Sequence, residues 1–474
     1  MEQTTGQREN WSSKVGFILA ATGSAVGLGN IWKFPYMAGS NGGGAFVLLY
    51  LSFVVIIGFT LTLGEFAVGR RKQKATVGAI KAYDKRFSFA GILGFMVCFF
   101  VMGYFPVIGG WALAYIPKVL GGLLSTDPAG YQATFDSFIA NPTAPIIWLS
   151  IYLVANLTIV LKGIQGGIEK AAKIFMPALA IILVVIAIRG LSLPGAMAGL
   201  EFLFKPDFST IDGGVAAKAL GQAFFSIGIG FGTMSTYGSY IRKDDNIVSN
   251  AGWVVGLDTC MAILAGIALF PALFAYGQDP AGGFGLVFTV MPTVFAGMGG
   301  FGIVLAILFF IGLFVAAITS SIGLQEVVVS YLIEEKNISR KKATLGSSVI
   351  MVVMCILASL SMGGVGPKLF GVGAFGVYDF FSSGMFIALA GLFVAVFASW
   401  RMGKEELLDE ITNSGKKPFA LFDTWFFALK YILPLVITYV LIWNIKSLYE
   451  TGYIGLFITS IGVIIASVVF SKKF

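Results

Sequence analysis

Oxygen-bearing side chains placed inside apolar segments are the residues of this chain best suited to chemistry. They are Asn30, Ser226, Asp258, Thr319 and Ser320. The 474-residue chain contains no histidine, so the commonest general base and the commonest transition-metal ligand are both absent. Oxygen donors without nitrogen or sulfur partners suit a hard monovalent cation such as Na⁺ or H⁺. For the hydroxyls at 319 and 320 a simpler role stays open, because helical Ser and Thr commonly bond the carbonyl one turn earlier.

A cluster of glycines interrupts the first long apolar segment. Gly23, Gly27 and Gly29 stand close together there, although each glycine costs a helix about 1 kcal/mol relative to alanine. Taken alone, such a cluster is typical of a small-residue face for helix packing. A similar run at Ile229–Gly232 lies five predicted helices later, an offset that reverses direction. The pair therefore predicts an inverted repeat with one broken helix in each half, whose free amides attract a carboxylate and whose carbonyls attract a cation.

Composition shows which elements position these residues. The chain is 57% hydrophobic and 12% charged, with a mean hydropathy of +0.88, which predicts an all-α polytopic membrane protein. About twelve apolar stretches are long enough to cross a bilayer. They are 14–37, 44–69, 88–123, 145–162, 170–189, 214–240, 248–276, 300–333, 342–362, 374–400, 421–446 and 452–470.

The net charge of +8 reflects membrane topology and predicts no nucleic-acid partner. A cytoplasmic N-terminus places most of the 32 lysines and arginines on the inner side, as the positive-inside rule requires. Both termini are then cytoplasmic, the location is the plasma (cell inner) membrane, and no removable signal peptide is expected. Cys98, Cys260 and Cys355 lie in apolar segments without CxxC spacing, so they are interpreted as packing residues.

The chain divides into five predicted parts. They are a cytoplasmic tail (1–13), a first five-helix repeat (14–189), an extracellular loop (190–213), a second five-helix repeat (214–402) and a cytoplasmic loop with helices 11 and 12 (403–474). The segment 285–295 is too apolar for a solvated loop, so we expect it to fold back into the protein.

Motifs along most of the chain resemble the neurotransmitter:sodium symporter family, in its bacterial amino-acid transporter type. The motifs are Gly27-Leu28-Gly29-Asn30-Ile31-Trp32-Lys33-Phe34-Pro35-Tyr36, Asn41-Gly42-Gly43-Gly44-Ala45-Phe46, Gln222-Ala223-Phe224-Phe225-Ser226, Tyr237-Gly238-Ser239-Tyr240, Thr319-Ser320-Ser321 and Tyr378-Asp379-Phe380. They occur in the family's order between about residues 8 and 402. The resemblance implies symport of an amino acid by alternating access, two sodium sites and no organic cofactor.

The resemblance also implies a role for individual residues. One sodium site would use Ala25, Asn30, Ser226, Asp258 and the substrate carboxylate, and the other Gly23, Val26, Ala316, Thr319 and Ser320. The Leu28 and Gly29 amides would meet the substrate carboxylate. The expected substrate site comprises Ser24, Ala25, Leu28, Gly29, Val101, Phe105, Phe225, Gly228, Phe231, Ser320 and Leu324.

Two ion pairs are implied as gates. Lys33 with Asp379 resembles the outer gate, and Arg8 with Glu334, beside Trp11, resembles the inner one. An unpaired charge at the outer end of a span is disfavoured, which supports the outer pair independently. Simpler readings stay open, because Lys33 could extend alone to the interface and Arg8 could be an ordinary positive-inside residue.

Three positions refine the expected substrate and ions. Asp258 stands where many relatives carry a neutral amide, so we expect its charge to replace a bound chloride and transport to be chloride-independent. Phe105 replaces a tyrosine that usually reaches the substrate carboxylate. Gly228 enlarges the pocket, which favours a large hydrophobic or aromatic amino acid.

Other function classes fit less well. An ion channel would need pore-lining repeats or rings of charge, and an enzyme would need a nucleophile with a base or a metal-ligand cluster. The runner-up is a proton-coupled amino-acid carrier of the same architecture, with Asp258 titrating. The expected partners are the amino-acid substrate and the lipid bilayer, and the mechanism requires no particular oligomeric state.

Overall fold

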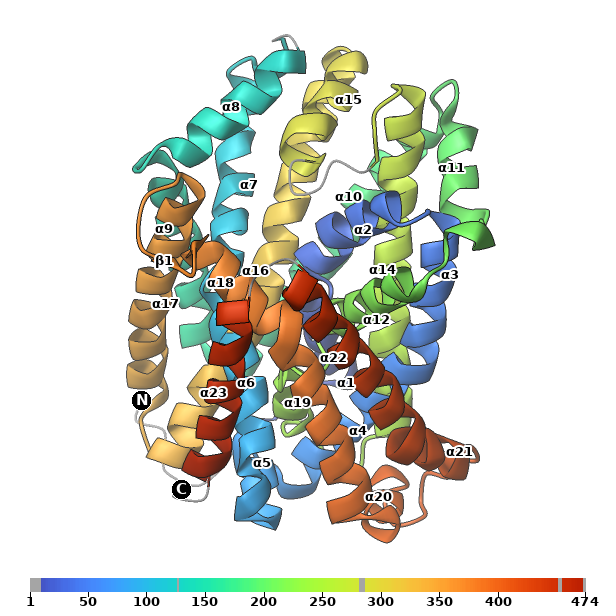
Figure 1. Cartoon of the computed structure of the whole chain (residues 1–474), viewed down its shortest axis with the longest axis vertical. Helices are drawn as coiled ribbons and strands as arrows, with labels where there is room; N and C mark the ends of the chain where they lie inside the picture. Colours follow the sequence, from blue (N-terminus) through green and yellow to red (C-terminus); the bar gives the residue numbers. More distant parts are fainter. Residues whose placement is uncertain (1–9, 126–127, 281–285, 451–453, 472–474) are drawn as a thin grey trace.

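The computed structural model describes residues 10–125, 128–280, 286–450 and 454–471, and in these ranges the chain forms a helical bundle (Figure 1). Nine of the described helices are long and apolar enough to cross a membrane, and the bent pair at the N-terminus makes a tenth. The strands in the described ranges form one hairpin, β1 (Lys368–Leu369) with β2 (Val372–Gly373). The protein is therefore an all-α, multi-pass membrane protein, as predicted.

The long spans follow the predicted apolar stretches. They contain α3 (Gly44–Phe53) with α4 (Phe59–Lys72), α6 (Ser88–Met102), α7 (Phe105–Leu120), α9 (Ala144–Leu161), α10 (Lys170–Leu191), α14 (Ile247–Ala275), α16 (Gly300–Lys336), α17 (Arg340–Met362), α18 (Ala374–Asp379) with α19 (Ile387–Val396), and α21 (Phe422–Phe427) with α22 (Leu433–Glu450). A final helix, α23, covers Ile454–Ser471.

Shorter helices and 3-10 turns lie between the spans, and most of the π-helical turns lie within them. The helices are α5 (Thr76–Tyr83), α8 (Pro128–Ala140), α11 (Ala196–Phe204), α15 (Met291–Gly297) and α20 (Lys404–Ile411), with 3-10 turns η3 (Lys85–Phe87), η4 (Leu123–Ser125) and η6 (Phe208–Thr210). The π-helical turns are η1 (Gly29–Lys33), η2 (Val54–Gly58), η5 (Ile164–Glu169), η8 (Leu286–Val290), η9 (Phe380–Phe386), η10 (Phe397–Met402) and η11 (Ala428–Ile432).

Polar caps set where several of these helices begin. At the start of the sixth predicted apolar stretch, the Asp212 carboxylate accepts a hydrogen bond from the Val215 amide, with a distance of 2.7 Å. The Asn246 side chain accepts from the Ser249 amide at 3.0 Å at the start of α14. Such caps satisfy amides that have no partner inside the helix, so the end of each span is defined by local chemistry.

The first and sixth spans are broken. α1 (Lys14–Ala25) is followed by η1 and α2 (Phe34–Ser40) with a bend of 51°. α12 (Gly213–Ile227) ends at Gly228, and α13 (Thr233–Gly238) begins five residues later. Gly228 and Gly230 have φ of 71° and 80°, a region that side chains disfavour. Local sequence therefore dictates the interruption.

The two broken spans run antiparallel with their breaks at the same level. α12 contacts η1 and α2, whereas α13 contacts α1. We call the end of the bundle that carries the start of α1 the inner end. The outer half of each broken span then packs on the outer half of the other. This arrangement brings both breaks together in the middle of the bundle.

The apolar segment before α16 is largely buried over 286–295, as predicted, and Gly285 lies outside the described residues. Phe288 in η8 is 1% exposed and packs against the rings of Trp111, Tyr115 and Phe310 at centroid distances of 5.8, 5.0 and 6.0 Å. α15 continues this segment and packs on α16 at the end of the bundle where α8 and α11 also lie (Figure 1). Aromatic packing therefore holds this connection against the bundle.

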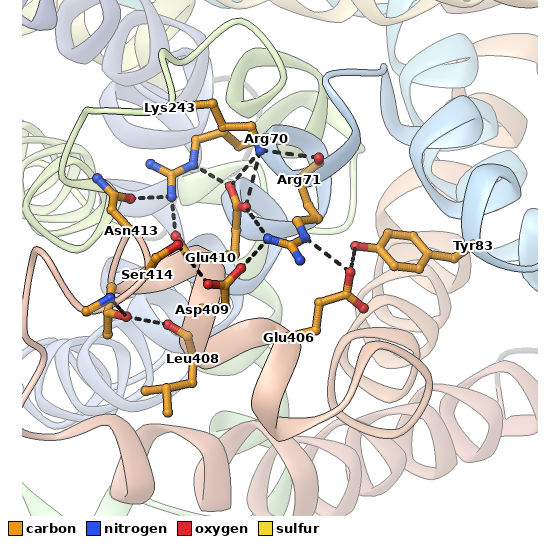
Figure 2. Close-up of polar contacts among 12 residues, drawn as sticks. Arg70, Arg71, Tyr83, Lys243, Glu406, Leu408, Asp409, Glu410, Asn413 and Ser414 are labelled. Atoms are coloured by element: carbon orange, nitrogen blue, oxygen red, sulfur yellow. Dashed lines mark hydrogen bonds and ion pairs between the residues drawn. The ribbon is translucent and has the colours of Figure 1, made fainter.

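A charge cluster ties three segments together at the inner end. Figure 2 shows the side chains of Arg70, Arg71 and Lys243 gathered around Glu410, which belongs to α20. Arg70 Nε lies 2.6 Å from Glu410 Oε1, and these side chains are 1% and 3% exposed. Arg70 also donates to the Asp245 carbonyl at 2.8 Å. The end of α4, the loop after α13 and the helix before α21 are thereby joined.

The neighbouring arginine makes a more exposed set of contacts. Arg71 lies 3.1 Å from Glu406 and 2.5 Å from Asp409, with 29% of its side chain exposed. The Ser414 hydroxyl and the Arg71 guanidinium hold the pKa of Asp409 below its ordinary value. Water screens such a pair, so its contribution to stability is small.

Replacing Arg70 with methionine is expected to destabilise the protein by about 3 kcal/mol, because it leaves a buried carboxylate with weakened compensation. Lys243 and Arg71, 3.2 and 3.4 Å from Glu410, retain part of that compensation. Thermal unfolding of the detergent-solubilised protein measures the change. Arg71→Met is the matched control and should cost about 0–1 kcal/mol; equal losses in the two variants would contradict a special role for Arg70.

Candidate functional site

A cavity lies where the two breaks meet. Its walls come from both broken spans together with α6, α7 and α16. The lining residues are Ser24, Ala25, Gly27, Gly29, Val101, Phe105, Phe225, Gly228, Phe231, Thr233, Ser320 and Leu324. The structure thus places the predicted substrate residues around one cavity, with the exception of Leu28.

Three residues differ between the predicted and the observed lining. Leu28 is fully buried and lies outside the lining set, so only its backbone could serve the predicted role. Gly27 and Thr233 line the cavity without having been assigned to the substrate site. Gly27 belongs to the interrupted run itself. Thr233 directly follows the second break, and extending that break by one residue would have included it.

The backbone of the first break approaches its neighbours very closely. A Cβ atom added at Gly27 would lie 2.3 Å from Ser320 Oγ, and one added at Gly29 would lie 3.0 Å from the Phe225 ring. Gly29 also accepts a hydrogen bond at its carbonyl from Gln222 Nε2 at 2.8 Å. Absence of side chains at these two positions therefore opens the backbone to the cavity.

The predicted first sodium site assembles around Asp258. Asn30 Nδ2 donates to Asp258 Oδ1 at 2.9 Å and to the Asp258 carbonyl at 3.0 Å. Ser226 Oγ donates to Asp258 Oδ2 at 2.8 Å, and it lies 3.0 Å from the Tyr50 hydroxyl. All four side chains are fully buried. These contacts bring together three of the four predicted protein ligands, from α12, α14 and the first break.

This group is chemically suited to a cation. In the described part of the chain, Asp258 receives hydrogen bonds from neutral groups and forms no ion pair with Lys or Arg. The Asn30 Oδ1 atom is buried and lacks a hydrogen-bond partner there. A buried carboxylate beside an unsatisfied carbonyl oxygen is costly without a compensating positive charge. Ala25, the fourth predicted ligand, lines the adjacent cavity.

The predicted second sodium site lies where α1 packs on α16. Gly23 faces Thr319, since an added Cβ would lie 3.5 Å from Thr319 Cβ. Thr319 Oγ1 donates to the carbonyls of Val315 and Ala316 at 3.0 and 3.1 Å. This bond to the preceding turn of the helix is the simpler role that the sequence left open for the Thr319 hydroxyl. The hydroxyl oxygen keeps a lone pair for a cation. Ser320 also belongs to α16, and Val26 directly follows α1.

A carboxylate holds the second break in place. Glu65 of α4 is fully buried and accepts from the Gly230 amide at 2.7 Å and from the Ser235 amide at 3.3 Å. The Gly230 amide lies within the interruption and the Ser235 amide in the first turn of α13, where amides have no helical partner. Glu65 therefore substitutes for the missing turn of helix, and its charge is used structurally.

The outer gate residues form no ion pair with each other in the described structure. Lys33 Nζ lies 3.9 Å from the centroid of the Phe225 ring, a cation–π contact at the cavity wall. Asp379 accepts from the Tyr104 and Ser383 hydroxyls, each at 3.0 Å. The Lys33–Asp379 gate therefore stays a prediction, and Tyr104 points to Asp379 while its neighbour Phe105 lines the cavity.

The inner end is closed around Trp11. Its ring is 3% exposed and packs edge-on against Phe17, Tyr237 and Tyr240 at centroid distances of 5.7, 5.2 and 6.2 Å. Its Nε1 donates to the Tyr237 carbonyl at 3.1 Å. A path from the cavity to this end is therefore blocked by aromatic packing.

The remaining inner-gate residues are only partly described. Glu334 accepts from the Ala75 amide at 2.8 Å, so it lies at the same end of the bundle as α5. Arg8 lies outside the described residues. The predicted Arg8–Glu334 pair therefore stays a prediction.

Comparison with known proteins places the chain among secondary transporters. The sequence profile described as the sodium:neurotransmitter symporter family matches residues 8–132 and 134–470. An uncharacterized sodium-dependent transporter, YhdH of Bacillus subtilis (strain 168), is 38% identical over 431 residues, 90% of this chain and 95% of that protein. An uncharacterized sodium-dependent transporter of Haemophilus influenzae is 34% identical over 462 residues, 94% of this chain and 100% of that protein. The crystal structure of MhsT in complex with L-phenylalanine matches with a TM-score of 0.85 and 42% identity, covering 92% of this chain and 99% of that one.

Proposed function

The chain belongs to the sodium:neurotransmitter symporter family, and from this premise we propose that it couples inward sodium movement to uptake of a hydrophobic or aromatic amino acid. Transport proceeds by alternating access in the plasma membrane, with both termini cytoplasmic. The observation that carries the proposal is the buried Asp258 carboxylate, which has neutral hydrogen-bond donors and the partnerless Asn30 Oδ1 beside it. A sodium ion there supplies the compensating charge and draws the substrate carboxylate to the same break.

The cavity supports an amino acid with a large side chain. Phenyl rings from Phe105, Phe225 and Phe231 face it, and Gly228 leaves room among them. The related MhsT binds L-phenylalanine in its crystal structure. The polar elements of the first break suit the α-carboxylate, while the aromatic walls suit an apolar or aromatic side chain.

Alternating access assigns roles to the two ends of the bundle. We propose that release of the substrate toward the inside requires Trp11 to leave its contacts with the surrounding aromatic rings. We also propose that Lys33 leaves Phe225 and approaches Asp379 when the outer path closes. The segment Gly167 to Pro177, now helical through η5 and α10, is proposed to unwind during inner release. The second sodium site between α1 and α16 would be opened by the same motion.

Uptake into proteoliposomes with imposed ion gradients tests the proposal. A sodium gradient should drive concentrative uptake of a radiolabelled amino acid from a competition panel, with leucine, phenylalanine, tyrosine and tryptophan competing better than glycine or dicarboxylates. Uptake driven by a proton gradient alone would replace the proposal with the proton-coupled carrier, in which Asp258 titrates. Replacing external chloride with gluconate should leave uptake unchanged, and full loss would refute the charge-replacement role of Asp258.

Phe105→Tyr is expected to preserve or tighten substrate binding by up to about tenfold, since a hydrogen bond contributes about 0.5–1.5 kcal/mol. The added hydroxyl would start from a ring that already lines the cavity and could reach the substrate carboxylate. Scintillation-proximity binding of the labelled amino acid measures the change. A large loss of binding would mean that the site accommodates a substrate of another kind.

A further inference from the structure

Thr233 is one of three hydroxyl side chains in the cavity lining, together with Ser24 and Ser320. Val101, Phe105, Phe231 and Leu324 present hydrocarbon to the cavity, whereas Thr233 lines it with a side chain that is only 2% exposed. Thr233 begins the inner half of the sixth span. A buried hydroxyl needs a hydrogen-bond partner.

The partner that the protein itself provides is weak. In the described ranges, the Thr233 Oγ1 atom has one hydrogen-bonding contact, with Cys98 Sγ at 3.6 Å. The Cys98 thiol donates to the Phe231 carbonyl at 3.0 Å, so its proton is already committed. Thiol sulfur is a poor acceptor. The Thr233 hydroxyl therefore keeps the capacity to bond a group inside the cavity.

Space and position allow a substrate to reach this hydroxyl. A Cβ added at Gly228 would meet only the Met234 side chain, at 3.9 Å, so the wall beside the second break is open. Gly29 starts the outer half of the first span and Thr233 the inner half of the sixth. Because these spans are antiparallel, the proposed carboxylate end and Thr233 lie on opposite sides of the breaks. A side chain that extends from one to the other would place its far end near Thr233.

We infer that Thr233 is a specificity-determining residue that hydrogen-bonds a polar atom at the far end of the substrate side chain, which makes a phenolic amino acid such as tyrosine a preferred substrate. The inference rests on the proposed function, and it narrows the substrate from hydrophobic or aromatic amino acids to those with a terminal hydroxyl. Phenylalanine fills the same cavity without using the hydroxyl. Discrimination between tyrosine and phenylalanine then depends on one oxygen atom of Thr233 and one oxygen atom of the substrate side chain.

Thr233→Val removes the hydroxyl and keeps the shape of the side chain. In proteoliposomes under a sodium gradient, this variant should weaken the apparent affinity for radiolabelled tyrosine roughly tenfold and change that for phenylalanine by less than about twofold. Thr233→Ser should restore the preference of the wild type. The matched control is Thr259→Val in α14, where the hydroxyl's hydrogen-bond partner among the described residues is the Val255 carbonyl of its own helix. Both affinities should stay unchanged.

The outcomes separate this inference from the proposal on which it rests. Sodium-driven phenylalanine uptake with an unchanged tyrosine-to-phenylalanine ratio in Thr233→Val overturns the role of Thr233 and leaves the proposed function standing. Wild-type protein that takes up phenylalanine but excludes tyrosine overturns it as well. Absence of sodium-driven uptake of either amino acid by the wild type overturns the proposed function and, with it, this inference.

Discussion

Asp258→Asn is expected to weaken sodium activation of uptake about 10- to 100-fold, because a hydrogen-bonded or coordinated charge contributes about 1.5–3 kcal/mol and each 1.4 kcal/mol is a factor of ten. The substitution keeps the shape of a side chain that Asn30 and Ser226 hold at 2.9 and 2.8 Å. It removes the charge that has no Lys or Arg compensation within the described residues. The sodium concentration for half-maximal uptake, measured in proteoliposomes, reports the change.

Two further measurements make the Asp258 prediction specific. Asp245→Asn, in the loop after α13, is the control and should leave sodium activation unchanged, because Asp245 lies at the inner end and offers its carbonyl to Arg70. External chloride should partly restore uptake by Asp258→Asn, since a mobile anion can replace the lost carboxylate. Normal sodium activation in Asp258→Asn would place the coupling ion elsewhere.

Gly27→Leu is expected to abolish transport while the protein still inserts and folds. The first added carbon would lie 2.3 Å from Ser320 Oγ and 3.2 Å from Ser320 Cβ, and the rest of the side chain would enter the cavity. Leucine also favours continuous helix across the break, by about 1 kcal/mol relative to glycine. Uptake below detection, together with a normal monomer peak in size-exclusion chromatography, is the expected result.

A glycine outside the site provides the control for Gly27→Leu. Gly256 in α14 is exposed, and a Cβ added there would meet nothing within 4 Å. Gly256→Leu should therefore insert, fold and transport like the wild type. Retained uptake by Gly27→Leu would show that the first break serves helix packing, the role that its composition suggests when it is considered alone.

The positions of the breaks in the first and sixth spans show what local sequence predicts by itself. Gly228, Gly230 and Gly232 adopt positive φ, and glycine is the residue that does so at little cost. The same reasoning from composition located the buried segment before α16. In both cases the decisive chemistry belongs to residues adjacent along the chain, so no knowledge of distant segments was needed.

The contacts across the bundle show what local sequence does not predict. Asn30 meets Asp258, and Arg70 meets Glu410, across separations of 228 and 340 residues. The first pair was expected only through a family resemblance. The second was not expected at all, because helix 11 and the loop before it carry no recognised motif. At such sequence separations a charged residue has many possible partners along the chain, and the tertiary packing determines which of them it meets.

The sequence by itself determined that the chain spans the membrane many times, that two of its spans are interrupted, and that oxygen donors stand beside the interruptions. Each of these follows from apolar length and from glycine placement along the chain. Only the tertiary structure decided that Thr233 faces the cavity while the Leu28 side chain turns away, and that Lys33 lies over Phe225 instead of beside Asp379. Helix rotation and the packing of distant elements set those directions, because a residue one position along a helix points about 100° away.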